Sequence, residues 1–175
     1  MKLLVIITAL IFSGCSDAME DKKSVINSED CDVFYKTIGP CVYKDITVNV
    51  DVKKISSDEK LLQHLNILKQ GNKYTLNISK NTSILEGDKG YISFADINFD
   101  NVPDVAITTS FGLASLYMDY WVFDAVKNEY TDIGNYTKFE INNKNKTLSN
   151  VIKINAAKYK NTTYSWRGFK LTELK

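Results

Sequence analysis

The chain has 175 residues, with 22 basic side chains, 21 acidic side chains and a formal net charge of +1. That length suits a single domain with a substantial hydrophobic core. A charge balance so close to neutral gives no reason to expect a nucleic-acid-binding protein.

The first fourteen residues have the composition of a secretory signal. Lys2 is followed by an apolar run over residues 3–12 and by two small residues, Ser13 and Gly14. A charged start, a short apolar core and small residues at the cleavage point are typical of a signal peptide. The apolar run is shorter than the about 20 residues that a membrane-spanning helix needs. We therefore expect residues 1–14 to be a lipoprotein signal peptide or an ordinary one.

Cys15 favours a lipoprotein signal over an ordinary signal peptide. The residues IFSGC that end at Cys15 resemble the lipobox of bacterial lipoproteins. The resemblance implies that Cys15 becomes the acylated N-terminus, anchored in the bacterial envelope and facing the periplasm. Several acyl chains would hold the protein firmly, because each buried methylene contributes about 0.8 kcal/mol. Ser16 after the cysteine favours attachment to the outer membrane. The alternative to lipidation is an ordinary signal peptide followed by a chance cysteine.

A polar segment separates Cys15 from the remaining two cysteines. Residues 15–30 are nearly free of large apolar side chains after Cys15, which predicts a flexible tether before one β-rich domain over residues 31–175. An isolated cysteine pair in an oxidising compartment usually forms a disulfide, so we expect Cys31 and Cys41 to be bonded. Two free thiols or a metal pair are the alternative, although no further metal ligands lie nearby in the sequence.

The apolar pattern predicts a strand and then a helix. Residues 46–52 alternate between apolar and polar side chains, which is typical of a half-buried strand. Residues 56–58 offer helix caps, and Gly71 is placed to end a helix. Between them the leucines have helical spacing, so we expect a helix near residues 57–70. The leucines that carry this pattern are Leu61, Leu62, Leu65 and Leu68.

The rest of the chain predicts short strands separated by turns. The candidates are residues 74–78 and the segments YISFA, VAITTS, LYMDYWVFD, KFEIN, VIKINAAKY and YSWRGFKLT. Successive short strands with turn residues between them favour antiparallel sheets. The expected fold class is therefore mainly β, with antiparallel sheets and one helix.

The segment DINFDNVPD, residues 96–104, has the composition of a cation-binding loop. Asp96, Asn98 and Asp100 occupy positions one, three and five, Val102 can offer its carbonyl at position seven, and Asp104 is at position nine. Calcium takes six to eight oxygen ligands, which alternate positions of a tight loop can supply. A bare polar turn is the alternative. Position twelve is Ile107, where a helix-loop-helix calcium site has glutamate, so a strand-loop-strand site is expected.

The same segment carries a family resemblance. FADINFDNVPDVAI resembles the D-x-N-x-D-G-x-x-D loop of FG-GAP-like, β-propeller-type repeats. With YMDYWVFDAVKNEY and KNKTLSNVIKINAAKY, it is similar to a family of bacterial lipoproteins that includes immunity proteins against lysozyme-like effectors of bacterial-killing secretion systems. The resemblance covers about half of the chain. It implies a degenerate, propeller-like β fold, for which a sandwich is the alternative arrangement, and a structural Ca²⁺ at residues 96–104.

The resemblance also implies a partner-binding segment. Inhibitory members of the family present a glycine-rich loop that ends in tyrosine to the active site of the enzyme. The corresponding stretch, TTSFGLASLYMDY, keeps one glycine. We expect the contact to lie within residues 110–120, beside the acidic loop, at Phe111, Gly112, Leu113, Tyr117 and Tyr120.

Few residues support other chemistry. His64 is the only histidine and is expected within the helix, so serine–histidine, cysteine–histidine and zinc sites lack residues. Alternation along a strand places Trp121 and Phe123 on one face and Tyr120 on the other, mostly as core. We therefore expect a non-enzymatic, protein-binding lipoprotein. The alternatives are an envelope-maintenance lipoprotein without a toxin partner and, less favoured, a hydrolase that uses the loop carboxylates.

Overall fold

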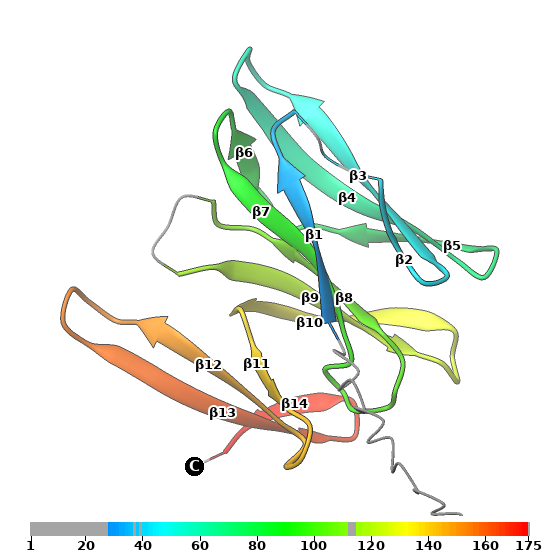
Figure 1. Ribbon diagram of the computed structural model, residues 1–175, viewed down its shortest axis with the longest axis vertical. Helices are drawn as coiled ribbons and strands as arrows, with labels where there is room; N and C mark the ends of the chain where they lie inside the picture. The colour runs from blue at the N-terminus through cyan, green and yellow to red at the C-terminus, as the bar shows by residue number, and fades with distance from the viewer. Residues whose placement is uncertain (1–27, 37, 39, 112–114, 175) are drawn as a thin grey trace, which may run out of the picture.

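The computed structural model describes residues 28–36, 38, 40–111 and 115–174, and this part of the chain is all β. Its strands form three antiparallel sheets (Figure 1), which confirms the expected fold class. In these residues there is no helix that is long and apolar enough to cross a membrane. The predicted signal peptide, Cys15 and most of the predicted tether lie outside the described residues.

The sheets are named A, B and C. Sheet A has the order β1 (Ser28–Phe34), β7 (Lys89–Ala95), β8 (Asp104–Thr108), β9 (Tyr117–Asp124) and β10 (Glu129–Thr137). Sheet B has the order β2 (Cys41–Tyr43), β3 (Ile46–Lys54), β4 (Glu59–Lys69) and β5 (Asn72–Asn77), and β6 (Ser83–Leu85) pairs with β4. Sheet C has the order β11 (Glu140–Asn142), β12 (Thr147–Lys153), β13 (Tyr159–Arg167) and β14 (Lys170–Glu173).

Sheet A is the middle layer of the molecule (Figure 1). A first hydrophobic core lies between sheets A and B, and a second lies between sheets A and C. Trp121 faces the first core and Tyr120 the second, as the alternation along β9 predicts. All five residues of β8 are buried, because this strand is covered on both faces. Strands that are covered in this way have near-continuous apolar runs.

The expected helix near residues 57–70 is wrong, because Glu59–Lys69 form β4, the long strand of sheet B, and the residues on either side form turns. β4 pairs with β3, β5 and β6. A β-bulge explains why the leucine spacing misleads. His64 pairs with Asp51 and Leu62 with Val52, which leaves Gln63 as an extra residue. The bulge therefore brings Leu62 and Leu65, three positions apart, to the same buried face, which imitates helical spacing.

The residues that predicted the two ends of the helix form turns in the structure. Ser56 donates a hydrogen bond to Asp58 Oδ1 at 2.7 Å in the turn between β3 and β4. Gln70 and Gly71 form the two-residue turn between β4 and β5, and both have positive φ angles of 50° and 83°. Positive φ at both central positions is the requirement of a type I′ turn, one of the two turns that usually close a two-residue hairpin. The histidine His64, expected in the helix, lies on β4 with Nδ1 3.9 Å from Asp51 Oδ2.

The folded part begins earlier than expected. Ser28, Glu29 and Asp30, which we expected in the tether, belong to β1 and pair with the last residues of β7. Ser28 lies opposite Ala95, next to the acidic loop. The chain therefore enters the domain at the acidic-loop end of sheet A.

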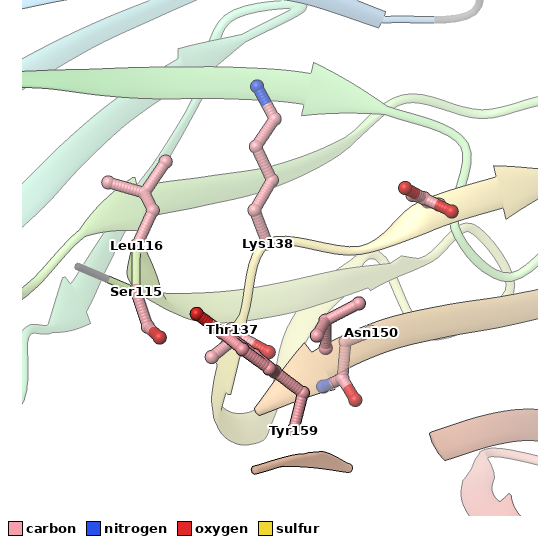
Figure 2. Close-up of a pocket in the computed structure, with 8 residues that line it drawn as sticks. Ser115, Leu116, Thr137, Lys138, Asn150 and Tyr159 are labelled. Atoms are coloured by element: carbon pink, nitrogen blue, oxygen red, sulfur yellow. The ribbon is translucent and has the colours of Figure 1, made fainter. Parts of the chain in front are cut away.

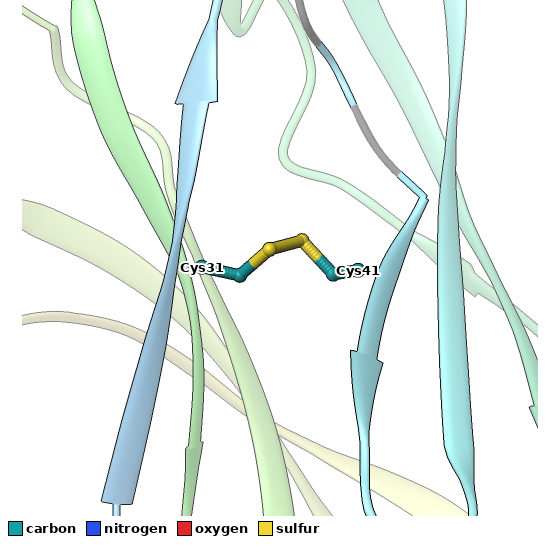
Figure 3. Close-up of a disulfide and its surroundings, with 2 residues drawn as sticks. All are labelled: Cys31 and Cys41. Carbon is teal, nitrogen blue, oxygen red and sulfur yellow. A yellow bond between two sulfur atoms is a disulfide. The ribbon is translucent and has the colours of Figure 1, made fainter.

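A disulfide joins two layers of the molecule. Cys31 on β1 is bonded to Cys41 on β2 with an S–S distance of 2.05 Å (Figure 3), which confirms the predicted pair. β1 belongs to sheet A and β2 to sheet B. The bond therefore links the two sheets that enclose the first core.

Replacement of Cys31 and Cys41 by alanine should lower the free energy of unfolding by about 3 kcal/mol, because the unfolded chain regains the entropy of an open loop. Urea denaturation of the oxidised protein and of the double variant measures the difference. A reducing agent should lower the stability of the wild-type protein and leave the double variant unchanged. An equal response of both proteins to the reductant would contradict the assignment.

Candidate functional site

The acidic loop connects β7 and β8, as the strand-loop-strand prediction requires. Ala95 and Asp104 pair across its base. Within the loop, Phe99 and Asn101 have positive φ angles of 65° and 68°. Asn101 thus adopts at position six the left-handed conformation that a calcium loop usually gives to glycine.

Three predicted ligands of the loop bond to one another and to its backbone. Asp96 accepts hydrogen bonds from the amides of Asp100 at 3.0 Å and Asn101 at 2.8 Å. Asn98 accepts one from the Asp100 amide at 3.1 Å and donates one to Asp100 Oδ2 at 2.9 Å. Asp100 Oδ1 accepts one from the Val102 amide at 2.8 Å. These side chains therefore fold the loop around itself.

Asp104 plays a different part from the other predicted ligands. Its side chain is buried, and it accepts hydrogen bonds from the amides of Ile97 and Phe123, each at 2.9 Å. Ile97 is in the loop, whereas Phe123 is on the neighbouring strand β9. Both oxygens of Asp104 thus join the loop to the middle sheet.

Burial dominates the electrostatics of this region. It raises the pKa of Asp104 well above its usual value, against the two backbone hydrogen bonds, and the charges of Asp100 and Asp96 raise it further. Lys69 is buried on the last position of β4, with Nζ 3.4 Å from the centre of the Phe123 ring. Burial lowers the pKa of Lys69, while the charges of Asp45, Asp104 and Asp100 oppose that change.

Only some of the predicted ligands in the loop are placed to bind a cation. Asp96, Asn98 and Asp100 converge, and a carboxylate oxygen that accepts one hydrogen bond keeps a second lone pair. Asp96 and Asp104 each direct both oxygens at backbone amides, but one partner of Asp104 is on β9, so Asp104 holds the loop to the sheet. Within the described ranges, no three acidic, histidine or cysteine side chains form a metal-binding group. Any ion would rest on Asp96, Asn98, Asp100 and the Val102 carbonyl.

Hydrogen bonds join the two ends of the predicted partner-binding segment. Ser110 Oγ donates a hydrogen bond to the Ser115 carbonyl at 3.1 Å and accepts one from the Tyr117 amide at 2.8 Å. Phe111 and Tyr117 are half-buried. The Phe111 ring lies against Gly90, where an added methyl group would overlap it. Gly112 and Leu113 lie outside the described residues.

Two expectations for this segment are wrong. Tyr120 is only 5% exposed in the second core, and its hydroxyl accepts a hydrogen bond from the Phe139 amide, so it offers no surface to a partner. The segment also does not lie beside the acidic loop. The loop precedes β8 and the segment follows it, so they lie at opposite ends of that strand (Figure 1). A five-residue strand separates its ends by roughly 16 Å.

Comparison of the chain with protein-family models, with curated proteins and with solved structures found no match. The family resemblance of the acidic loop therefore stays a prediction. The arguments on function below rest on the geometry of this chain.

Replacement of Asp104 by asparagine should destabilise the protein by about 1–3 kcal/mol in acid, because an amide group cannot accept hydrogen bonds from both Ile97 and Phe123. A raised native pKa means that the folded state holds the Asp104 proton more tightly than the unfolded state. The stabilisation that this gives the wild-type protein is complete below an unfolded pKa of about 4 and is lost as pH rises towards the native pKa. The deficit of the variant should therefore shrink with rising pH.

Urea denaturation across this pH range, with a chelator present, measures both effects. Asp88→Asn is the matched control, because Asp88 also accepts a backbone hydrogen bond, from Leu85, at an exposed turn. A deficit for Asp104→Asn that is constant with pH would contradict the raised pKa.

Proposed function

We propose that the protein is a lipid-anchored protein of the bacterial envelope that binds another protein through the connection between β8 and β9, residues 109–116, and through Tyr117, the first residue of β9. The observation that carries this proposal is the placement of two features at opposite ends of sheet A. The chain enters the domain at Ser28, opposite Ala95 and beside the acidic loop. The β8–β9 connection is at the other end of β8.

Acylation of Cys15 would attach the domain to a membrane through residues 16–27, and hence at the Ser28 end. Phe111 and Tyr117 would then stand at the end of sheet A that is remote from the attachment point. Aromatic side chains are favoured anchors in protein interfaces, since they bury large areas at low conformational cost. The hydrogen bonds of Ser110 fix the base of the connection, which lowers the entropy that a partner must remove on binding.

The most specific form of this proposal is an immunity or inhibitor protein that blocks a lytic effector acting on the cell wall. Its support is the sequence resemblance together with the position of the connection at the end of sheet A opposite to Ser28. An outer-membrane anchor facing the periplasm would hold the protein where such an effector arrives. A structural Ca²⁺ in the acidic loop belongs to the same proposal.

A soluble form of the protein should capture and inhibit a secreted peptidoglycan hydrolase. Tyr117→Ala should weaken capture at least about tenfold, because it removes an interface anchor. Phe169→Ala is the control, since Phe169 is an exposed aromatic side chain in the turn between β13 and β14. Pull-down from secreted hydrolases and a cell-wall lysis assay measure both steps. Failure of the wild-type protein to retain any hydrolase, or equal loss in both variants, would count against the proposal.

Millimolar Ca²⁺ should raise the Tm of the protein, because a ligand that binds only the folded state stabilises it by about 2.7 kcal/mol at one hundred times its Kd. Asp100→Asn should abolish the rise, because Asp100 is exposed in the loop and supplies oxygens without holding β9. Asp88→Asn should retain it. Melting curves with Ca²⁺ and with a chelator make the comparison, and identical wild-type curves would remove the ion from the proposal.

A further inference from the structure

The charged side chains are unevenly distributed along the chain. Residues 141–172 include seven basic side chains and no acidic one, whereas the rest of the chain has 15 basic and 21 acidic side chains. The seven are Lys144, Lys146, Lys153, Lys158, Lys160, Arg167 and Lys170. They belong to sheet C and its turns, so one outer layer of the molecule is basic. Such an asymmetry suggests contact with nucleic acid or with a membrane.

The structure exposes these cations and leaves most of them without a counter-ion. All seven side chains are exposed. Among the described residues, Lys160 is the only one of the seven in an ion pair, with Glu173 at 3.1 Å. By contrast, the neighbouring Lys138 is bonded to Asp30 Oδ2 at 2.6 Å and points away from Asn150 of sheet C (Figure 2). The six unpaired cations can therefore interact with an anionic partner.

Four of the six unpaired cations gather at one end of sheet C. Lys144 and Lys146 are in the turn between β11 and β12, and Arg167 and Lys170 flank the turn between β13 and β14. The register of β12 with β13 places these two turns at the same end. The other two unpaired cations are in the β12–β13 hairpin at the opposite end. The nine residues of β13 separate the two ends by roughly 27 Å.

Exposed apolar side chains accompany the four cations. Phe169, in the turn between Arg167 and Lys170, is 55% exposed. Lys127 Nζ lies 5.4 Å from the centre of its ring, which brings the β9–β10 turn to the same place. Val126 in that turn is 96% exposed. Apolar side chains among cations are typical of proteins that lie on a membrane surface, whereas Val126 offers nothing to a nucleic-acid backbone.

This end of sheet C is also the end at which the chain enters the domain. Trp166 Nε1 donates a hydrogen bond to the Ile97 carbonyl at 2.6 Å, so β13 contacts the acidic loop next to the β13–β14 turn. Ser28, the first residue of β1, pairs with Ala95 at the start of that loop. An acyl chain on Cys15 would therefore hold the four cations close to a membrane.

The acidic loop adds little opposing charge at the surface of this end. Asp96 and Asp104 are buried, whereas Asp100 is exposed. One exposed carboxylate of the loop thus faces solvent near four unpaired cations. Glu129 and the buried Asp124 of the β9–β10 hairpin are each 3.5 Å from Lys127 Nζ, so Lys127 neutralises part of their charge.

We propose that this end of the domain, formed by the β9–β10, β11–β12 and β13–β14 turns, binds the surface of an anionic phospholipid membrane. The inference rests on the proposed function, because the predicted anchor brings this end to a membrane. The four cations would lie among the lipid phosphates, while Val126 and Phe169 enter the headgroup layer. The β8–β9 connection, at the other end of β8, would then point away from the membrane.

Sedimentation with vesicles tests the proposal. Full-length protein with Cys15→Ala, which cannot be acylated, is mixed with phosphatidylcholine vesicles or with vesicles of an equal mixture of phosphatidylcholine and phosphatidylglycerol. Binding to the anionic vesicles should exceed binding to the neutral ones at least about tenfold at low salt. High salt should remove the difference, because it screens exposed charges. Equal binding to both kinds of vesicle at low salt would overturn the proposal.

Two double variants of this protein locate the contact. Arg167→Gln with Lys170→Gln should weaken binding to the anionic vesicles at least about tenfold, because each cation at an anionic membrane surface contributes about fivefold. Lys153→Gln with Lys158→Gln removes the same charge at the opposite end of sheet C. This control should bind like the parent protein, since exposed charges are screened beyond about 10 Å. An equal loss in both variants would overturn the proposal.

A second pair keeps the test decisive if the first variant does not fold. Lys144→Gln with Lys146→Gln, in the neighbouring turn, should weaken binding in the same way, and parent-like binding by this folded variant would overturn the proposal. Tighter binding of a DNA duplex than of the anionic vesicles, lost in the same variants, would assign this end to nucleic acid and also overturn it. Mass spectrometry of Cys15 tests the lipid anchor separately, and capture of a hydrolase through Tyr117 tests partner binding.

Discussion

The coverage of sheet A on both faces is the constraint on which the rest of the structure depends. Because β8 and β9 contact sheets B and C at once, the acidic side chains they carry must find partners inside the protein. Asp104 accepts the amides of Ile97 and Phe123. Asp119 accepts the Ser79 amide at 2.6 Å, the Ser79 hydroxyl at 2.7 Å and the Asn135 amide group at 2.7 Å. These carboxylates hold the loops and layers together.

Much of the fold could be predicted from the sequence, because alternation and turn residues are local signals. The predicted segments YISFA, VAITTS and LYMDYWVFD correspond to β7, β8 and β9, whereas VIKINAAKY and YSWRGFKLT each span a turn between two strands. The Cys31–Cys41 bond was predicted from the cysteine count and an oxidising compartment. The helix prediction failed because the bulge at Gln63 changes the spacing of buried residues, and only pairing with β3 reveals a bulge. β10 was not predicted because its register shifts between Asp132 and Gly134, which interrupts the alternation.

The candidate site was predictable in composition but not in its arrangement. The ligand-like spacing of Asp96, Asn98 and Asp100 is visible in the sequence, whereas the turn of Asp104 towards β9 depends on strand pairing. Nothing local distinguishes Tyr120, which is buried, from Tyr117, which is half-buried. The burial of Asn150 was not predicted because asparagine usually indicates a turn. The apolar Val151 beside it was the available signal, and only the register with β13 shows which of the two faces the core.

The two cores differ in how their buried polar groups are compensated. Around the first core, the buried Lys69 ammonium has no hydrogen bond within the described part of the chain. It lies 3.4 Å from the centre of the Phe123 ring, which supplies a favourable interaction for a cation. On the strands of sheets A and C, the polar side-chain atoms of Thr137, Asn150 and Thr162 have no hydrogen bond to any of the described residues. A buried polar group without a partner costs about 1–3 kcal/mol in desolvation, so these groups weaken the second core, whereas the contact between Lys69 and Phe123 supports the first.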